Sequence, residues 1–190
     1  VAKVGLKAVR SSVQEAKPLA DALTKAGGLT AARTDYSPAE VKAYVAEVLS
    51  KGDAARGELV YRRKDATCLA CHAIAGAGGQ VGPDMTSIGA SAQVDYLVES
   101  ILMPDKAVKE GYHALKVSTL DGKVVVGVKT READGKLYLR TSEDKEIAIP
   151  EKDIDEKAQS RSLMPDGLGD QLTRQEFVDL IRFLSELGVE

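Results

Sequence analysis

Apolar residues recur every three or four positions along most of the chain, which is the spacing of one face of an α-helix. The clearest start signal is Ser37, a good N-cap, followed by Pro38 at the first helical position and by Glu40, which completes a capping box. The same kinds of signal predict three further helices: one after Asp53, one before Pro104 and one after Thr173. The pattern therefore predicts a mainly α protein.

Residues 1–35 are predicted to be a separate helical segment at the N-terminal side. Apolar residues recur at helical spacing on both sides of Pro18, and Gly27-Gly28 ends the second run. The chain begins with Val1 and shows no apolar signal segment, so we expect that a leader has been removed or that the chain is part of a longer protein.

The spacing changes to strict alternation of apolar and polar residues between about residues 112 and 158. The alternating apolar positions are Leu115 and Val117, Val124 to Val128, Leu137 and Leu139, and Ile147 and Ile149. Asp121-Gly122 and Asp134-Gly135 are typical hairpin turns between such runs. We therefore expect a small antiparallel β-meander, inserted in a helical domain over residues 36–190.

Composition and charge exclude several classes of partner. The 190 residues carry a formal net charge of −3, so no electrostatic footprint for nucleic acid is present. The longest stretch without Asp, Glu, Lys or Arg, residues 66–83, contains four glycines and His72, so we expect no membrane span. Aromatic residues make up only 4%, with no Trp, so something other than aromatic rings is expected to fill part of the core.

The chemistry of the chain is concentrated in Cys68-Leu-Ala-Cys71-His72, which contains its only two cysteines. In a Cys-x-x-Cys-His motif, two thiols on one turn form thioethers with a haem, and the next residue's imidazole binds the iron. A covalently attached haem c also explains the shortage of aromatic residues, because a large planar apolar group takes their volume. Attachment implies an oxidising compartment, so we expect a periplasmic or other extracytoplasmic location.

Three alternative interpretations of the motif remain open. A thioredoxin-like dithiol requires a preceding strand and a βαβ pattern, and neither is predicted here. Half of a zinc site requires a second pair of ligands, whereas the only other histidine is His113. The third interpretation is that the Cys-x-x-Cys-His sequence occurs by chance or has only a structural role.

The order of several motifs resembles that of a class I cytochrome c. These motifs are Gly57-x-x-x-Tyr61, Cys68 to His72, Gly82-Pro83-Asp84, and Met164-Pro165 before a terminal helix. Residues 36–190, with GxGGxVGPDxTxIG at 76–89 and SLMPDGL at 162–168, are similar to the C-terminal haem domain of large predicted membrane-bound dehydrogenases of planctomycetes and verrucomicrobia. The resemblance implies a class I cytochrome c helical fold around one haem, with residues 1–35 as the end of a helical repeat.

The donors that would complete the haem site are expectations of the same resemblance. It implies that Met164 is the second axial ligand and that the Pro83 carbonyl accepts the second ring N–H of His72. It also implies a close crossing of Gly57 and Tyr61 with the last helix. The residues alone leave Met85, Met103 and His113 as further candidates for the axial position.

The expected function is single-electron transfer by a domain without catalytic residues of its own. The expected partner is a fused dehydrogenase domain or another redox protein, and the oligomeric state stays open. The competing hypothesis is a haem enzyme or gas sensor with an open sixth position, for which His113 is the only obvious distal group. A third hypothesis gives the β insertion a role in recognising a partner, with a structural haem.

Overall fold

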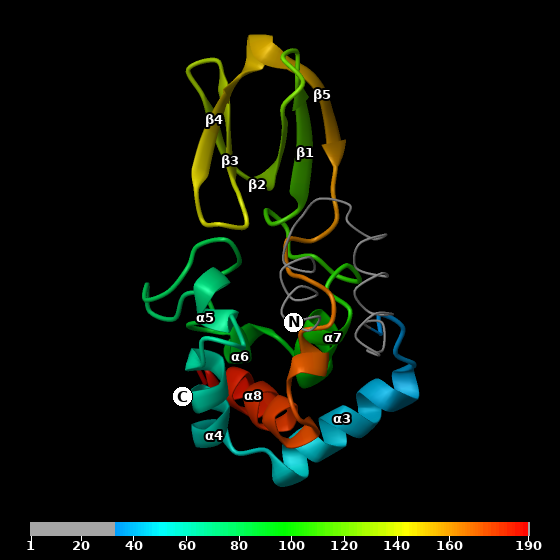
Figure 1. Ribbon diagram of the computed structural model, residues 1–190. Coiled ribbons are helices and arrows are strands. Elements are labelled where there is room, and N and C mark those ends of the chain that lie inside the picture. Colours follow the sequence, from blue (N-terminus) through cyan, green and yellow to red (C-terminus); the bar gives the residue numbers. More distant parts are fainter. Residues whose placement is uncertain (1–32, 190) are drawn as a thin grey trace. The chain divides into compact units, whose positions relative to one another are not determined.

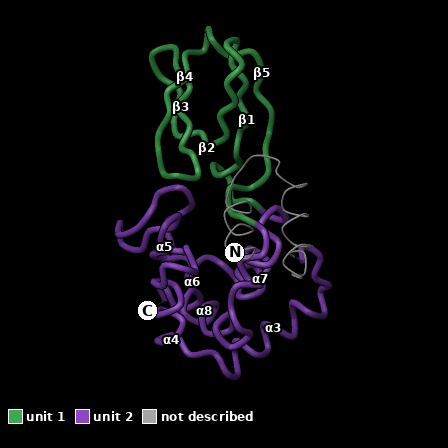
Figure 2. The backbone as a smooth tube through the Cα atoms, viewed as in Figure 1, with its two compact units in different colours: residues 1–31, 108–165 green, residues 32–107, 166–190 purple. Residues whose placement is uncertain are grey.

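The computed structural model describes residues 33–189 and separates into two compact units (Figure 2). Within the described residues, the helical unit consists of residues 33–107 and 166–189, and the sheet unit consists of residues 108–165. Most of the predicted N-terminal helical segment 1–35 lies outside the described residues.

The prediction of a mainly α, class I cytochrome c fold is wrong. Helices contain 38% and strands 22% of the described residues, which makes the protein mixed α and β. The predicted meander is a five-stranded antiparallel sheet with its own hydrophobic core, formed by Val117, Leu137, Leu139 and Ile149. The sequence pattern understated the sheet because the fifth strand, Ile-Asp-Glu-Lys-Ala-Gln, is mostly polar and does not alternate.

The helical unit consists of six α-helices and one 3-10 turn among the described residues (Figure 1). Their bounds are α3 Pro38–Lys51, α4 Ala54–Arg62, α5 Cys68–Cys71, α6 Ile88–Ser91, α7 Val94–Leu102, η2 Gly169–Gln171 and α8 Arg174–Glu186. Helix α8 packs against α3, α4, α6 and α7. It is therefore the centre of this unit.

The helix starts follow the predicted signals. Ser37 caps α3 and Thr173 caps α8, each with the predicted Glu three residues later completing a capping box. The side chain of Asp53 caps α4 by accepting a hydrogen bond from the amide of Arg56. These starts are confirmed because each depends only on residues within one helical turn.

Helices α4 and α8 cross closely at Gly57. A methyl group at this position would lie 2.0 Å from the carbonyl oxygen of Asp179, so the crossing requires glycine. One turn further along α4, the rings of Tyr61 and Phe183 pack with their centroids 5.7 Å apart. The close crossing expected for Gly57 and Tyr61 is thus present, and it fixes the helix that leads to the cysteine motif.

The strands of the sheet unit are β1 Ala114–Thr119, β2 Val124–Ala133, β3 Lys136–Arg140, β4 Glu146–Pro150 and β5 Ile154–Gln159. Their order in the sheet is β4-β3-β2-β1-β5, with every neighbouring pair antiparallel. The turn between β2 and β3 is the predicted Asp134-Gly135, where both residues have positive φ, as a type I′ turn requires. A 3-10 turn, Glu151–Asp153, then leads the chain to β5, which pairs with β1 instead of with β4.

Candidate haem-attachment site

The cysteine motif forms a single helical turn of its own, α5. The preceding helix α4 ends at Arg62, and Thr67, with φ of +62°, turns the chain just before Cys68. Residues 63–67 therefore separate the motif from the end of α4. Both cysteines are half-buried and neither forms a disulfide.

The ring of His72 is held by the glycine-rich loop that follows the motif, residues 73–89. Its Nδ1 lies 2.8 Å from the carbonyl oxygen of Pro83, the pair that the family resemblance implied. A methyl group at Gly82 would lie 2.3 Å from Cε1 of the ring, so only glycine allows the loop to lie against the imidazole. Burial lowers the pKa of His72, and the Pro83 carbonyl opposes this effect. In the neutral ring, an Nδ1–H that donates to Pro83 leaves the Nε2 lone pair for a metal.

The backbone of the motif is also held in place by hydrogen bonds from the surrounding chain. The amides of Gly79 and Gly82 donate to the carbonyls of Leu69 and Cys71 at 2.9 and 2.8 Å. The buried Tyr61 hydroxyl donates to the carbonyl of His72 at 2.8 Å. The loop after the motif thus folds back against the backbone of the cysteine motif.

This donor set fits a covalently attached haem c. Two thiols on one turn, followed by an imidazole with one nitrogen held by a carbonyl, are the groups that the attachment needs. The close approach of Gly82 to the ring shows that the backbone of the loop lies directly against the imidazole. The residues that would hold the cofactor in the helical unit are therefore Cys68, Cys71 and His72, with Pro83 fixing the histidine.

The geometry disfavours a reactive dithiol. Burial raises the pKa of the Cys68 thiol to about 11, and the nearby Cys71 acts in the same direction. The protonated thiol lies 3.7 Å from the carbonyl of Ala66, to which it donates. Disulfide oxidoreductases require the opposite, a thiolate at neutral pH. The element before the motif is helix α4, whereas that family places a strand there.

A zinc site also finds little support in the described part of the chain. Among residues 33–189, no group of three or more His, Cys, Asp or Glu side chains lies close enough together to hold a metal ion. A tetrahedral zinc site that used Cys68 and Cys71 would therefore need ligands from outside these residues.

The four candidates for the second axial ligand have different surroundings. Met85 and Met103 are buried in the helical unit, as expected for packing residues. His113 is exposed just before β1, and its Nδ1 lies 3.4 Å from the side-chain amide of Gln159. Met164 is half-buried and belongs to the sheet unit, where its amide donates to the hydroxyl of Ser162 at 3.2 Å. Its assignment as a ligand stays a prediction.

Sequence reasoning missed the roles of Asp84 and Thr86. The Asp84 carboxylate accepts a hydrogen bond from the amide of Thr86 at 2.7 Å, and the Thr86 hydroxyl accepts one from the amide of Ala75 at 2.6 Å. An Asp two residues before a Thr is a known turn-forming pair, so the spacing carried a signal for the local turn. It carried none for the contact with Ala75, eleven residues earlier.

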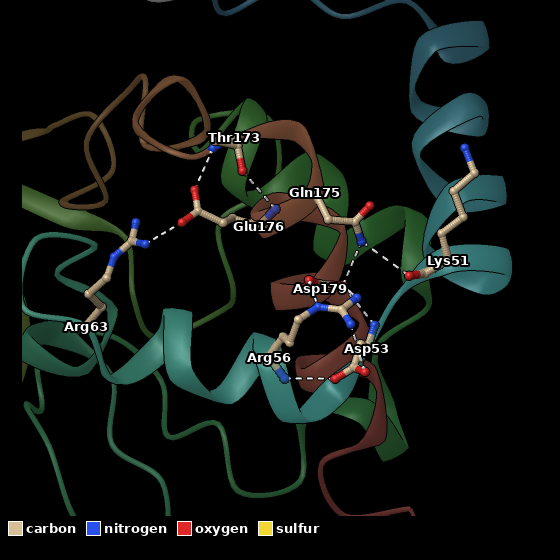
Figure 3. Close-up of polar contacts among 8 residues, drawn as sticks. All are labelled: Lys51, Asp53, Arg56, Arg63, Thr173, Gln175, Glu176 and Asp179. Atoms are coloured by element: carbon tan, nitrogen blue, oxygen red, sulfur yellow. Dashed lines mark hydrogen bonds and ion pairs between the residues drawn. The ribbon is translucent and has the colours of Figure 1, made fainter.

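A buried carboxylate joins the start of α4 to α8 (Figure 3). The side chain of Asp179 is 3% exposed and accepts hydrogen bonds from Arg56 Nε at 2.7 Å, from the Asp53 amide at 2.9 Å and from Gln175 Nε2 at 2.9 Å. Burial raises the pKa of Asp179, but these hydrogen bonds, with Arg56 foremost, outweigh burial and hold it below the ordinary value. The sequence did not reveal this cluster, because a helix position for Asp usually indicates a surface.

A second ion pair, between Arg63 and Glu176, joins the end of α4 to the first turn of α8 (Figure 3). The two polar contacts lie at opposite ends of α4 and together fix the helix against α8. Because only five residues separate the end of α4 from Cys68, the two helices set the position of the motif.

Comparison with models of protein families and with curated proteins found no match to this chain. Among the described residues, no helix is long and apolar enough to span a bilayer.

Proposed function

We propose that the chain is a mono-haem c-type cytochrome domain that transfers single electrons. The observation that carries the proposal is the Cys68-x-x-Cys71-His72 turn, whose histidine ring is held at Nδ1 by the Pro83 carbonyl. Bound haem c would supply one iron that accepts and returns a single electron. The chain itself would bind the group covalently, orient it and exclude water, with no catalytic residue required.

Each residue of the motif has a distinct role in this proposal. Cys68 and Cys71 would form the two thioether links, so the group could not dissociate. His72 would bind the iron through Nε2, because Nδ1 is occupied by Pro83. Gly82 and the Tyr61 hydroxyl would keep the ring and its backbone from moving between redox states. A site that moves little on electron transfer is what a carrier requires.

We propose Met164 as the second axial ligand, since Met164-Pro165 stands before the terminal helix in the order that the resemblance implies. A thioether ligand raises the reduction potential relative to a second histidine. The redox partner would be a dehydrogenase domain or a soluble carrier, in the periplasm or another extracytoplasmic space.

The attachment is tested by producing the chain in a bacterial periplasm together with the haem-attachment machinery. The intact mass should exceed the sequence mass by one haem, and the colour should stay with the polypeptide in acid acetone. A variant with Cys68→Ala and Cys71→Ala should yield no coloured polypeptide, whereas Met103→Leu should attach haem normally. Extraction of all colour into the organic phase from the unaltered chain would show that the proposal is wrong.

Carbon monoxide binding then tests the axial ligand and separates an electron carrier from a haem enzyme or sensor. The reduced protein should not bind carbon monoxide at neutral pH, whereas Met164→Ala should bind it and have a lower reduction potential. Met85→Leu is the matched control and should behave as the unaltered chain. Ready binding by the unaltered chain would favour the open-site alternative.

A further inference from the structure

Two short turns within the glycine-rich loop are joined by a single pair of side chains, Asp84 and Thr86. The Asp84 carboxylate accepts hydrogen bonds from the amide and the hydroxyl of Thr86 and, at 3.4 Å, from the amide of Gly76. The Thr86 hydroxyl in turn accepts a hydrogen bond from the amide of Ala75 at 2.6 Å. The pair therefore connects residues 83–86 with the turn that directly follows the cysteine motif.

The turn that Asp84 and Thr86 contact, at Ala75 and Gly76, has an uncommon backbone conformation. Ala75 and Gly76 both have positive φ, +51° and +76°, and the amide of Ala75 donates to Thr86 while that of Gly76 donates to Asp84. A residue with a Cβ, such as Ala75, rarely adopts this region unless neighbouring contacts hold it there. The hydrogen bonds to Asp84 and Thr86 are contacts of that kind.

The Pro83 carbonyl, which accepts the hydrogen bond from His72, directly precedes Asp84 in the chain. Pro83 stands between Gly82, whose amide donates to the Cys71 carbonyl, and Met85, whose amide donates to the Ala73 carbonyl, both at 2.8 Å. Those two bonds hold the ends of the segment, and the side chain of Asp84, the residue after Pro83, is itself fixed by its bonds to Thr86 and Gly76. That oxygen accepts from His72 Nδ1.

We propose that Asp84 and Thr86 are positioning residues that set the strength of the His72–Pro83 hydrogen bond, and through it the electron donation of His72 to iron. This inference rests on the proposed haem function. A hydrogen bond from Nδ1–H to a carbonyl makes the imidazole a stronger donor, which favours the oxidised iron. Loss of the hydrogen bonds that join Asp84 and Thr86 to the turn at Ala75 weakens the His72–Pro83 hydrogen bond. The reduction potential then rises.

The test compares variants of the haem-loaded chain. Thr86→Val removes the hydroxyl without changing charge, and Thr86→Ser keeps it. The matched control is Thr119→Val, because Thr119 forms the same kind of pair with Asp121 in the sheet unit. The measurements are the reduction potential and, by NMR of the reduced protein, the solvent exchange rate of the His72 Nδ1 proton.

Thr86→Val should raise the reduction potential and speed the exchange of the His72 Nδ1 proton. Thr86→Ser should keep both at the values of the unaltered chain, and Thr119→Val should change neither. If haem attaches normally and Thr86→Val keeps the potential and exchange rate of the unaltered chain, the positioning role is wrong while the haem function stands. If no haem attaches to the unaltered chain, both proposals fail together, and the mass measurement distinguishes this case from the first.

Discussion

Replacing Arg56 with Gln should destabilise the helical unit, because it removes the main partner of a buried carboxylate. Arg56 donates from Nε at 2.7 Å and from Nη2 at 2.9 Å to Asp179, whose side chain is 3% exposed. After the change, Asp179 retains the Asp53 amide and Gln175 but loses the guanidinium that pairs with it. The carboxylate would then remain buried with its charge poorly compensated.

The size of the effect follows from the burial of the two partners. Breaking a fully buried pair costs about 4 kcal/mol, and breaking an exposed one costs about 0.5 kcal/mol. The Arg56 side chain is 54% exposed, so water replaces part of what is lost. We therefore expect the free energy of unfolding to fall by about 2 kcal/mol, within the range for hydrogen bonds to a charged group.

The assay is guanidinium denaturation of the haem-loaded chain, followed by the helical circular dichroism signal. Arg62→Gln is the matched control, because Arg62 pairs with Glu58 on the same helix and both side chains are exposed. It should cost no more than about 0.5 kcal/mol. A double mutant with Asp179→Asn should lose less than the sum of the single changes. Equal costs for Arg56→Gln and Arg62→Gln, or strict additivity, would refute the reasoning.

The Arg56–Asp179 pair should also make the free energy of unfolding depend on pH. The pKa of Asp179 is lowered in the folded protein, so its contribution is complete above the unfolded pKa of about 3.9 and is lost as pH falls through the folded value. Without Arg56, burial is less opposed and the folded pKa rises. The stability difference between the unaltered chain and Arg56→Gln should therefore be largest near neutral pH and should shrink on acidification below about pH 4.

Two further changes test the site and the sheet separately. Tyr61→Phe should lower the free energy of unfolding by about 1–2 kcal/mol, because it leaves the His72 carbonyl without its 2.8 Å donor; an unchanged denaturation midpoint would contradict this. Leu139→Ala removes a fully buried side chain from the sheet core and should cost about 2–5 kcal/mol. Amide exchange in β2 and β3 should accelerate accordingly, and Ile147→Ala, on the neighbouring strand but more exposed, should have a smaller effect.

Local signals predicted the elements that depend on residues close together in the chain. The capping boxes at Ser37 and Thr173 formed as expected, since each joins residues three positions apart. The Asp134-Gly135 hairpin turn formed for the same reason. The Cys-x-x-Cys-His spacing likewise places both thiols and the imidazole on one turn, so the candidate site could be identified before any fold was known.

The tertiary structure alone decided the contacts between distant residues. Strand β5 has a charged sequence without alternation. It becomes a strand because it pairs with the edge of β1, where Leu115 lies opposite Gln159. This pairing adds the fifth strand to the sheet. The burial of Asp179 likewise depends on a distant segment, helix α4, more than 120 residues earlier. The hydrogen bond between Ala75 and Thr86 depends on how the loop folds back. A single sequence shows the preferences of each segment, but which segments meet is set by the packing of the whole chain, because burial and long-range pairing have no local pattern.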